Sequence, residues 1–290
     1  MIIIRLQGGL GNQMFQYALY TSLKARGKEV KIDDVTGYIG DQKRVPMLET
    51  TFPLSYERPE TDEVNDMLDM RRDFSNRLRR LFSGSRSKMR SEVRDGNFEE
   101  DVLDADDVYL NGYWQTEKYF ADTEVQRQLR IDFNQEPSQT LQSQEAWDLF
   151  NKIRNSESVG MHIRRGDYTE PGTIEVHGNI CTEDYYRKAV EYMLEKEPRA
   201  VFYIFSDDRE WVSEHFNGDR FVIAQSETPF SDKEDMLLMR TCKHNIIANS
   251  SFSWWAAWLS HYPDKHVVAP SKWLNTKNMT DVYTDRMVRL

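Results

Sequence analysis

SVGMHIRRGDY, residues 158–168, places an apolar run directly before Arg164, Arg165, a glycine and Asp167. Successive strand side chains point to opposite faces, so a strand that ends here aims the two arginines in different directions. We expect one guanidinium to bind a ligand anion, because its planar fork matches phosphate oxygens, while the other arginine or Asp167 holds the loop. Taken alone, these residues also fit a surface loop closed by an Arg–Asp ion pair.

The composition is that of a soluble protein with two domains. The chain has 290 residues, of which 39% are hydrophobic and 12% aromatic, which suits two ordinary cores and excludes a disordered chain. Its net charge of −10 argues against nucleic acid as the main partner, since phosphate backbones attract basic surfaces. Cys181 and Cys242 form neither a disulfide framework nor a zinc pattern, and the apolar start at residues 1–6 is too short for a signal peptide or membrane span. We therefore predict a cytoplasmic protein.

A βαβ unit opens the chain. Residues 2–6 are typical of a buried strand, residues 12–26 of a helix and residues 29–34 of a second strand, which together predict a parallel sheet. The turn before the helix contains Gly9 and Gly11, which let a ligand approach the backbone at a helix N-terminus. We therefore expect this turn to contact a ligand.

The same turn favours a rival function. Gly9-x-Gly11 with an acid at Asp33 partly matches a dinucleotide-binding fingerprint, which would make the protein a nicotinamide- or flavin-dependent oxidoreductase. Met14 stands at the third glycine position, where its side chain would obstruct close packing of the helix on the strand. The oxidoreductase is therefore the alternative and not the first interpretation.

Basic residues concentrate between residues 71 and 90, within an insertion near residues 57–95. This stretch predicts a solvated helical hairpin over the sheet, or a basic helix that contacts an anionic membrane surface or an acidic acceptor. A strand is predicted at residues 108–115. Tyr113 and Trp114, near its end, suit either stacking on a sugar face or a place in the core.

The second domain, residues 138–290, follows a polar linker at residues 135–139 and alternates strands with helices. This alternation predicts a doubly wound parallel sheet, whose ligands bind beyond the carboxyl ends of the strands. We predict strands at residues 158–163, 200–205, 221–224, 244–248 and 267–270, and helices at residues 140–154, 183–196, 231–242 and 252–262.

Polar clusters follow three of these strands and have the chemistry that a nucleotide diphosphate requires. The arginines suit the pyrophosphate, and a serine pair at a helix N-terminus offers hydroxyl and amide groups to the same phosphates. Asp207 or Asp208 is expected to accept hydrogen bonds from the base or the ribose. In the structural alternative, these serines and aspartates only cap the helices that follow. The clusters comprise His162 to Asp167, then Ser206, Asp207 and Asp208, and finally Asn249, Ser250 and Ser251.

No metal site is predicted. Divalent ions in nucleotide-sugar enzymes favour Asp-x-Asp directly after an apolar strand, but Asp104-Ala105-Asp106 precedes its strand and Asp207-Asp208 lacks the spacer. Paired arginines would neutralise a leaving diphosphate without a divalent ion.

Three motifs together resemble the alpha-1,2-fucosyltransferases of glycosyltransferase family 11: GGLGNQMFQYA at residues 8–18, HIRRGDY at 162–168 and NSSFSWW at 249–255. The resemblance covers nearly the whole chain. It implies an α/β fold of two facing Rossmann-like domains of the GT-B type, with the acceptor side in residues 1–137 and GDP-fucose bound by residues 138–290. It also implies a metal-independent, inverting transfer of L-fucose to the 2-hydroxyl of a terminal galactose. A bacterial member would act in the cytoplasm on polysaccharide or lipid-linked oligosaccharide precursors, with the basic stretch at residues 71–90 available for peripheral membrane contact.

The implied mechanism gives the residues roles. Arg164 and Arg165 inherit contact with the donor diphosphate, and Asp167 is the first candidate for the base that takes the acceptor proton. The other candidates for that base are Glu170, Glu175, His177 and Asp33. The donor site is completed by His162, Ser206, Asp207, Asp208, Asn249, Ser250 and Ser251, while Asn12 and Gln13, beside Gly9 and Gly11, would bridge fucose and acceptor. A non-catalytic galactoside-binding protein that uses Trp114 and Trp254 is the remaining alternative.

Overall fold

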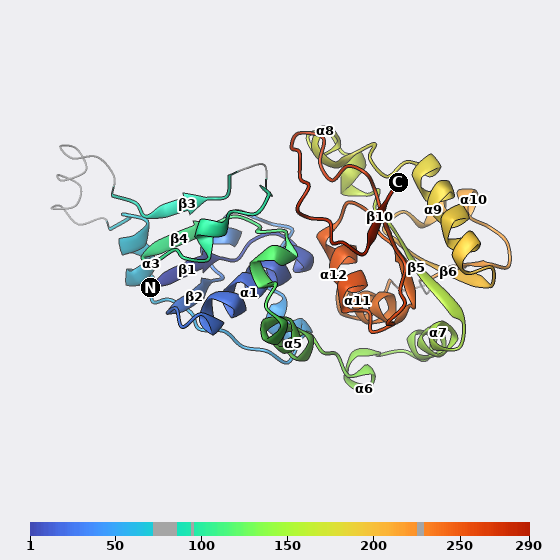
Figure 1. Cartoon of the computed structure of the whole chain (residues 1–290), viewed down its shortest axis with the longest axis horizontal. Helices are drawn as coiled ribbons and strands as arrows, with labels where there is room; N and C mark the ends of the chain where they lie inside the picture. The colour runs from blue at the N-terminus through green and yellow to red at the C-terminus, as the bar shows by residue number, and fades with distance from the viewer. Residues whose placement is uncertain (72–85, 94–95, 225–228) are drawn as a thin grey trace. The chain divides into compact units, whose positions relative to one another are not determined.

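The computed structural model describes residues 1–71, 86–93, 96–224 and 229–290, and the chain divides into two compact units, residues 1–134 and 135–290 (Figure 1). The division lies ahead of the boundary that we placed after residue 137. The stretch predicted as a polar linker is not extended, because it contains the start of α6 (Pro137–Thr140). Within unit 2, the side chain of Gln135 donates a hydrogen bond to the carbonyl of Lys233 at 2.8 Å.

Unit 1 is built on a parallel sheet with the strand order β2-β1-β4-β3. The predicted βαβ unit is confirmed: β1 (Ile2–Arg5) and β2 (Val30–Asp33) are parallel neighbours joined through α1 (Leu10–Ala25). β4 (Val108–Asn111) pairs with the other side of β1, so β1 is an inner strand, and its apolar side chains are buried. The helix begins at Leu10 rather than at residue 12, because Gly9 in an extended conformation is its N-cap.

Short elements surround this sheet. They are η1 (Thr36–Tyr38), α2 (Leu48–Thr51), α3 (Thr61–Met67), η3 (Glu100–Val102), η4 (Glu117–Phe120) and α5 (Thr123–Asp132).

The basic stretch at residues 71–90, predicted as a helical hairpin or a basic helix, lies largely outside the described residues. β3 (Met89–Ser91) is a strand that pairs in parallel with β4 at the edge of the sheet. The described end of the stretch is therefore extended and paired with β4. Two of its cations have partners already, since Lys88 lies 2.5 Å from a carboxylate oxygen of Asp107 and Arg90 lies 2.8 Å from one of the buried Glu99.

Unit 2 contains a parallel sheet with the strand order β10-β9-β8-β5-β6-β7. Numbered from the start of the unit and read from β7, this order is 3-2-1-4-5-6, the doubly wound arrangement, with its reversal between β5 and β8. The predicted α/β class with two parallel sheets is therefore confirmed. The strands are β5 (Glu157–Ile163), β6 (Ala200–Ser206), β7 (Phe221–Ile223), β8 (His244–Ile246), β9 (Val267–Ala269) and β10 (Met287–Arg289).

β10 is a strand that the sequence pattern does not predict. Three residues are too few for a period of two to be recognisable. The segment becomes a strand because β9 offers it an open edge, where the backbone N–H of Leu290 donates to the carbonyl of Ala269 at 3.1 Å.

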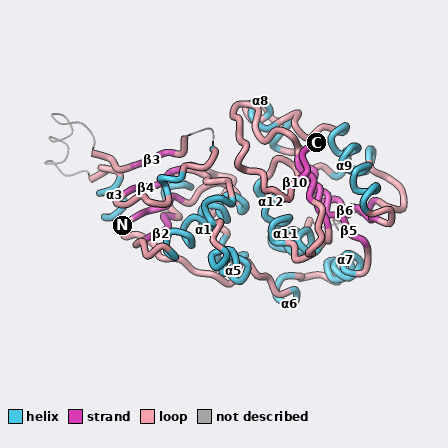
Figure 2. Tube along the Cα trace, in the orientation of Figure 1, coloured by secondary structure: helices cyan, strands magenta, loops and turns pink. Residues whose placement is uncertain are grey.

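Helices cover both faces of the sheet in unit 2 (Figures 1 and 2). On one face Tyr186 and Met193 of α9 (Glu183–Lys196) pack with Val212 of α10 (Arg209–His215) against buried strand residues. α11 (Asp232–Thr241) and α12 (Ser251–Leu259) lie on the other face. Thr182 and Ser231 are N-caps whose side chains accept hydrogen bonds from the first turns of α9 and α11. The unit also contains α7 (Gln144–Arg154), η5 (Asp167–Thr169) and α8 (Ile174–His177).

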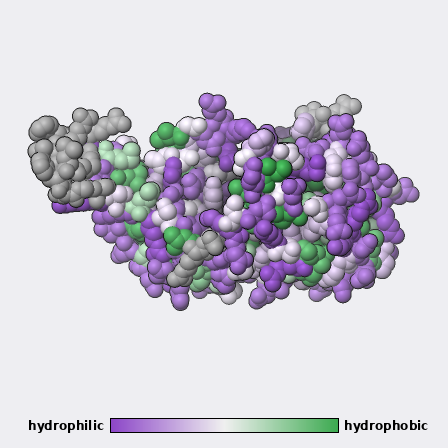
Figure 3. Space-filling view, turned by 90° about the horizontal axis from the view of Figure 1, so that it is seen from above, coloured by the Kyte–Doolittle hydropathy of each residue, from purple (hydrophilic) through white to green (hydrophobic). Residues whose placement is uncertain are grey.

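Hydrophilic residues dominate the face drawn in Figure 3, where the apolar residues form small separate groups. Among the helices in the described ranges, none combines the length and the apolar character that crossing a bilayer would require.

Candidate functional site

The three polar clusters that the sequence singles out all lie at the carboxyl ends of strands of unit 2. They follow β5, β6 and β8, and β5 and β8 are the neighbours between which the strand order reverses. Ligands of open parallel sheets bind in the crevice at such a reversal. The candidate site is therefore built from segments far apart in the sequence.

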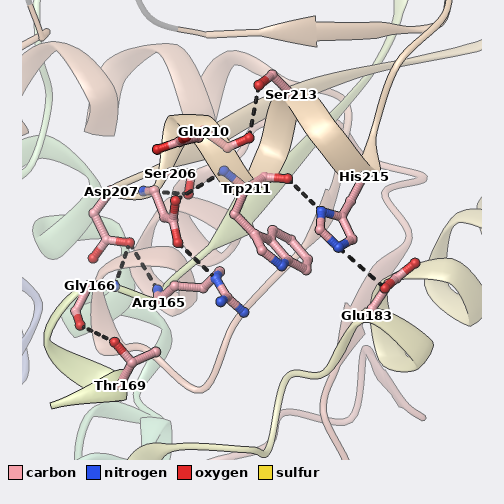
Figure 4. A network of polar contacts seen from close by, with 11 residues as sticks. Arg165, Gly166, Thr169, Glu183, Ser206, Asp207, Glu210, Trp211, Ser213 and His215 are labelled. Atoms are coloured by element: carbon pink, nitrogen blue, oxygen red, sulfur yellow. Dashed lines mark hydrogen bonds and ion pairs between the residues drawn. The ribbon is translucent and has the colours of Figure 1, made fainter.

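Arg164 is held by two carboxylates. Its Nε and Nη2 donate to Oδ1 of Asp167 at 3.0 and 2.8 Å, and its Nη1 lies 3.0 Å from Oδ2 of Asp207. The other oxygen of Asp207, Oδ1, accepts the backbone N–H groups of Arg165 and Gly166 at 2.9 and 3.1 Å (Figure 4). Asp207 thus fixes both the backbone and the first guanidinium of residues 164–169, which we call the arginine loop.

Arg165 is oriented differently from Arg164, as the alternation of strand side chains predicts. Its Nε donates to Oδ2 of Asp208 at 2.9 Å, and its guanidinium lies 4.3 Å from the ring centre of Trp211 (Figure 4). Burial raises the pKa of Asp208, but the hydrogen bonds from Arg165 and from the backbone N–H of Trp211 outweigh burial and lower it. The two Nη atoms of Arg165 make no hydrogen bond or ion pair within the described ranges, so they can receive an anion.

Gly166 is required where it stands. A Cβ atom built on this glycine would lie 2.7 Å from Oδ2 of Asp207, closer than van der Waals contact permits. Only a residue without a side chain lets the arginine loop approach the carboxylate that holds it.

Asn249 ties the arginine loop to the rest of the sheet edge. Its backbone carbonyl accepts the hydroxyl of Tyr168 at 3.1 Å, and its side-chain amide donates to the carbonyls of His177 and Trp273, both at 3.1 Å. The ring of Tyr168 stacks on that of His177 at 4.8 Å. Asn249 is buried and its amide is occupied, so in this structure it connects three segments, and its predicted contact with a phosphate stays a prediction.

The N-terminus of α12 keeps hydrogen-bonding capacity. Ser250 occupies the N-cap position, but its side chain makes no cap hydrogen bond and it is partly exposed. Helix N-termini attract anions through their free N–H groups. The structural alternative, in which the Ser250 hydroxyl serves only as a cap, is therefore not what is observed.

His162 is buried beneath the arginine loop as a neutral imidazole. Burial, and then the charge of Arg164, lower its pKa to about 3, while Asp207 acts in the opposite direction. Its Nδ1 has no hydrogen-bond partner in the described part of the chain, and its ring lies 6.0 Å from that of Phe252 in the first turn of α12.

Two predicted nucleotide contacts are replaced by structural roles. Asp207 and Asp208, which we expected to bind a base or ribose, are instead committed to Arg164, Arg165 and the loop backbone. The hydroxyl of Ser206 accepts the backbone N–H of Asp208 at 3.0 Å. The middle cluster thus holds the arginine loop, because arginine side chains outcompete water for carboxylates that lie beside them.

The candidates for the general base differ in availability. Asp167 has one oxygen, Oδ1, occupied by Arg164, whereas its Oδ2 makes no hydrogen bond or ion pair with a described residue. Asp33 is buried, and its carboxylate accepts the hydroxyls of Thr36 and Tyr109 at 2.5 and 2.6 Å besides two backbone N–H groups. Asp33 is therefore wrong both as a base and as the ribose-binding acid of a dinucleotide site.

The glycine turn of unit 1 is only partly open to a ligand. Gly9 has open space where a side chain would stand, whereas Gly11 is buried. Asn12 is half-buried and accepts a hydrogen bond from Gln115 at 2.6 Å. Gln13 is buried, donates to two backbone carbonyls and accepts the N–H of Met47. Its predicted role as a bridge between the two substrates stays a prediction.

Both tryptophans of the galactoside-binding alternative are core residues. Trp114 is fully buried and packs edge-on against Tyr119, and Trp254 is fully buried and donates its indole N–H to the carbonyl of Val282 at 2.6 Å. Neither ring face is free to stack on a sugar, which removes the feature on which that alternative rested.

One cluster in the described ranges has the composition of a metal site, but its hydrogen bonds do not fit one. Glu157, Glu197 and His244 have ligand atoms within 4.8 Å of one another. Nδ1 of His244 accepts the backbone N–H of His266 at 3.0 Å, so the neutral ring carries its proton on Nε2, the atom that faces Glu197. A protonated nitrogen offers no lone pair to a metal.

Three features of this site escape sequence reasoning. Trp211 reads as a core residue of a helix, yet it supports Arg165. Asn249 reads as a ligand contact, yet it ties three segments together. Asp207 contacts both arginines although it is 42 residues from Arg165, and no pattern in the sequence near either residue predicts this contact.

Known proteins are similar to this chain over most of its length. Residues 86–288 match the profile of Glycosyl transferase family 11. The chain is 32% identical to an alpha-1,2-colitosyltransferase of Escherichia coli, covering 100% of this chain and 98% of that protein. It is also 32% identical to the O-antigen biosynthesis glycosyltransferase WbnK of Escherichia coli, covering 98% and 99%. A shorter match, 31% identical over 38% of this chain and 30% of the relative, is to the galactoside 2-alpha-L-fucosyltransferase SEC1 of Bos taurus. The protein therefore belongs to glycosyl transferase family 11 and is a glycosyltransferase.

Proposed function

We propose that this glycosyltransferase transfers L-fucose from GDP-fucose to the 2-hydroxyl of a terminal galactose, with inversion and without a metal ion. The observation that carries the proposal is the pair of unpartnered Nη atoms of Arg165 at the strand-order reversal of unit 2. Support also comes from the alpha-1,2 linkage and the 2-alpha-L-fucosyl transfer in the names of two relatives.

The reaction is a single displacement. The galactose 2-oxygen forms a bond to C1 of fucose while the bond from C1 to the GDP oxygen breaks, and the acceptor proton passes to a base. Negative charge grows on the diphosphate as the sugar becomes oxocarbenium-like. Arg165 and the N-terminus of α12 would bind that charge, with Arg164 contributing its field from beside them. These groups supply the positive charge that a divalent ion would otherwise bring.

The proposed base is Asp167, through Oδ2. Pairing of Oδ1 with Arg164 keeps the carboxylate in one orientation. A weak base suffices when the leaving group departs early and the hydroxyl loses its proton late in the displacement.

The direct test is GDP release from GDP-fucose in the presence of a panel of galactosides, each with and without EDTA. We expect release only with acceptors that carry a terminal galactose, a product linked alpha-1,2, and equal rates with and without the chelator. Loss of activity with EDTA would refute the metal-free mechanism. Release with no galactoside dependence would refute the transfer itself.

A second donor deserves the same assay. Colitose is L-fucose without its 3-hydroxyl, and the relative matched over the full chain is named as a colitosyltransferase. We infer that the two GDP-sugars compete for one site. A ratio of kcat/KM above one for GDP-fucose over GDP-colitose supports the fucosyl assignment, and a ratio below one reverses it.

A further inference from the structure

We infer that a second anion-binding site, distinct from the proposed diphosphate site, lies in a pocket of unit 2 formed by the segment that follows β9, and that it binds a phosphate group carried by the acceptor glycan. The pocket has a volume of about 330 Å³, within the range of small-ligand sites. Its walls include Lys272, Trp273, Lys277, Tyr283 and Arg289. The assignment of its ligand to the acceptor rests on the proposed function.

The pocket is positively charged in an acidic protein. Lys272, Lys277 and Arg289 line it, and none of the lining residues, all of which are described, is acidic. None of the three cations forms an ion pair with a described carboxylate, although the chain has a net charge of −10. Unpaired cations that converge on a concave surface favour a phosphate there.

Tyr283 adds a hydrogen-bond donor that has no other use. Its hydroxyl oxygen is buried and has no partner in the described part of the chain, although Tyr283 lines the pocket. The guanidinium of Arg289 lies 5.1 Å from the centre of the Tyr283 ring, and Trp273 packs edge-on against the same ring at 6.1 Å. The hydroxyl and the guanidinium are thus held in one wall, where both can donate to one phosphate.

Arg289, in the pocket wall, is too far from Arg164 for both to bind a single diphosphate. β10 carries Arg289 and lies three strand positions from β5, the strand that precedes Arg164. At the usual spacing between neighbouring strands, the distance between β10 and β5 is about 14 Å. A donor diphosphate cannot span that distance, whereas an oligosaccharide of a few sugars can. The ligand of the pocket is therefore a separate anionic group.

The two sites are nevertheless joined by hydrogen bonds. Asn275, in the pocket wall, donates its backbone N–H to the carbonyl of Val176 and its side-chain amide to that of Gly178, both at 2.8 Å. Asn249 donates to the carbonyl of Trp273 in the same wall and accepts the hydroxyl of Tyr168 from the arginine loop. An acceptor anchored in the pocket would thus be held at a fixed distance from the arginine loop.

The test compares two glycans that end in the same galactose, one with a phosphate at its reducing end and one with a neutral methyl group there. Calorimetry on the full chain first measures GDP binding, whose absence would refute the proposed function. With GDP bound, we expect the phosphorylated glycan to bind about tenfold more tightly than its neutral twin. Equal affinities would overturn the second site alone.

Variants locate the effect. Lys277→Gln combined with Arg289→Gln should abolish the preference, and Tyr283→Phe should reduce it several-fold without lowering the melting temperature, because its hydroxyl has no partner to lose. Lys152→Gln, which removes one positive charge from an exposed position of α7 outside the pocket, should keep the preference. Inorganic phosphate should compete with the phosphorylated glycan and not with the neutral one. A preference that persists in the double variant, or no competition by phosphate, would refute the pocket as the site.

Discussion

Asp207, at the end of β6, binds Arg164, which follows β5, with Oδ2 3.0 Å from Nη1. Its other oxygen takes the N–H groups of Arg165 and Gly166, so one carboxylate fixes the side chain of one arginine and the backbone of the other. Asp207 thereby positions the guanidinium of Arg164 and the backbone that carries Arg165.

Asp207→Asn should lower kcat/KM at least tenfold and lower the free energy of unfolding by about 1–3 kcal/mol. The amide keeps an acceptor for the loop backbone, but its NH2 group faces a guanidinium that can only donate. Kinetics and urea unfolding measure the two effects. Asp264→Asn, on an exposed loop, is the matched control and should change neither. Normal kinetics in Asp207→Asn would contradict the role of Asp207 as a positioning residue.

Substitutions of the two arginines should affect different steps, GDP binding for Arg165 and turnover for Arg164. Arg165→Ala removes the unpartnered Nη atoms, so we expect GDP to bind much more weakly, and Arg165→Lys should not restore it because lysine lacks the planar fork. Arg164→Ala should lower turnover about 10²–10³-fold with the fold intact. Calorimetry with GDP and steady-state kinetics measure these. Unchanged transfer in Arg164→Ala would exclude any role in stabilising the diphosphate.

Two glycines provide a matched pair of substitutions. Gly166→Ala places a Cβ 2.7 Å from Asp207, so it should destabilise the arginine loop and reduce GDP binding. A Cβ atom on Gly9 would meet no other atom within 4 Å, and the φ angle of Gly9 is −76°, which any residue adopts. The melting temperature of Gly9→Ala should therefore match that of the parent. If a substrate approaches the turn of unit 1 closely, Gly9→Ala should still lose activity. Full activity would show that no ligand packs against Gly9.

Asp167→Asn distinguishes between two roles of Asp167, that of the general base and that of a structural partner of Arg164. As a base, Asp167 would be needed for turnover, so kcat should fall about 10²-fold or more and the acidic limb of its pH profile should disappear, with GDP affinity little changed. As a loop holder, it would mainly support Arg164, so GDP affinity should fall while the shape of the pH profile stays. The pH profile of kcat and the Kd for GDP distinguish the two roles.

His162 should make the protein less stable in acid. Its folded-state pKa of about 3 lies below its ordinary value of 6.5, so between these pH values the unfolded state binds more protons than the folded state. Stability is unaffected by this group above pH 6.5 and falls as the pH is lowered towards 3. The loss in the free energy of unfolding is about 2 kcal/mol at pH 5. Urea unfolding at pH 7 and pH 5 should therefore show a smaller pH dependence for His162→Asn than for the parent. An equal dependence would contradict the prediction.

Much of the fold follows from the sequence. Apolar runs of strand length alternate with amphipathic helical patterns, and caps such as Thr182 and Ser231 mark helix starts, because these signals act between residues close in the chain. The same logic places polar residues after strands, where parallel sheets bind ligands. Where local signals are weak, as at β3 and β10, prediction fails, because an edge strand forms only when a neighbour offers its backbone.

By itself, then, the sequence determined the α/β class, the alternation of elements and the three polar clusters, including the run that ends in Arg164 and Arg165. Only the tertiary structure decided which members of those clusters remain open to a ligand. Asn249, Gln13 and Asp33 spend their hydrogen bonds inside the protein, whereas Arg165 keeps two nitrogens free. The physical reason is that strand order brings residues such as Arg165 and Asp207, 42 positions apart, into contact. No local pattern in the sequence shows which hydrogen-bond donor will pair with which acceptor in the fold.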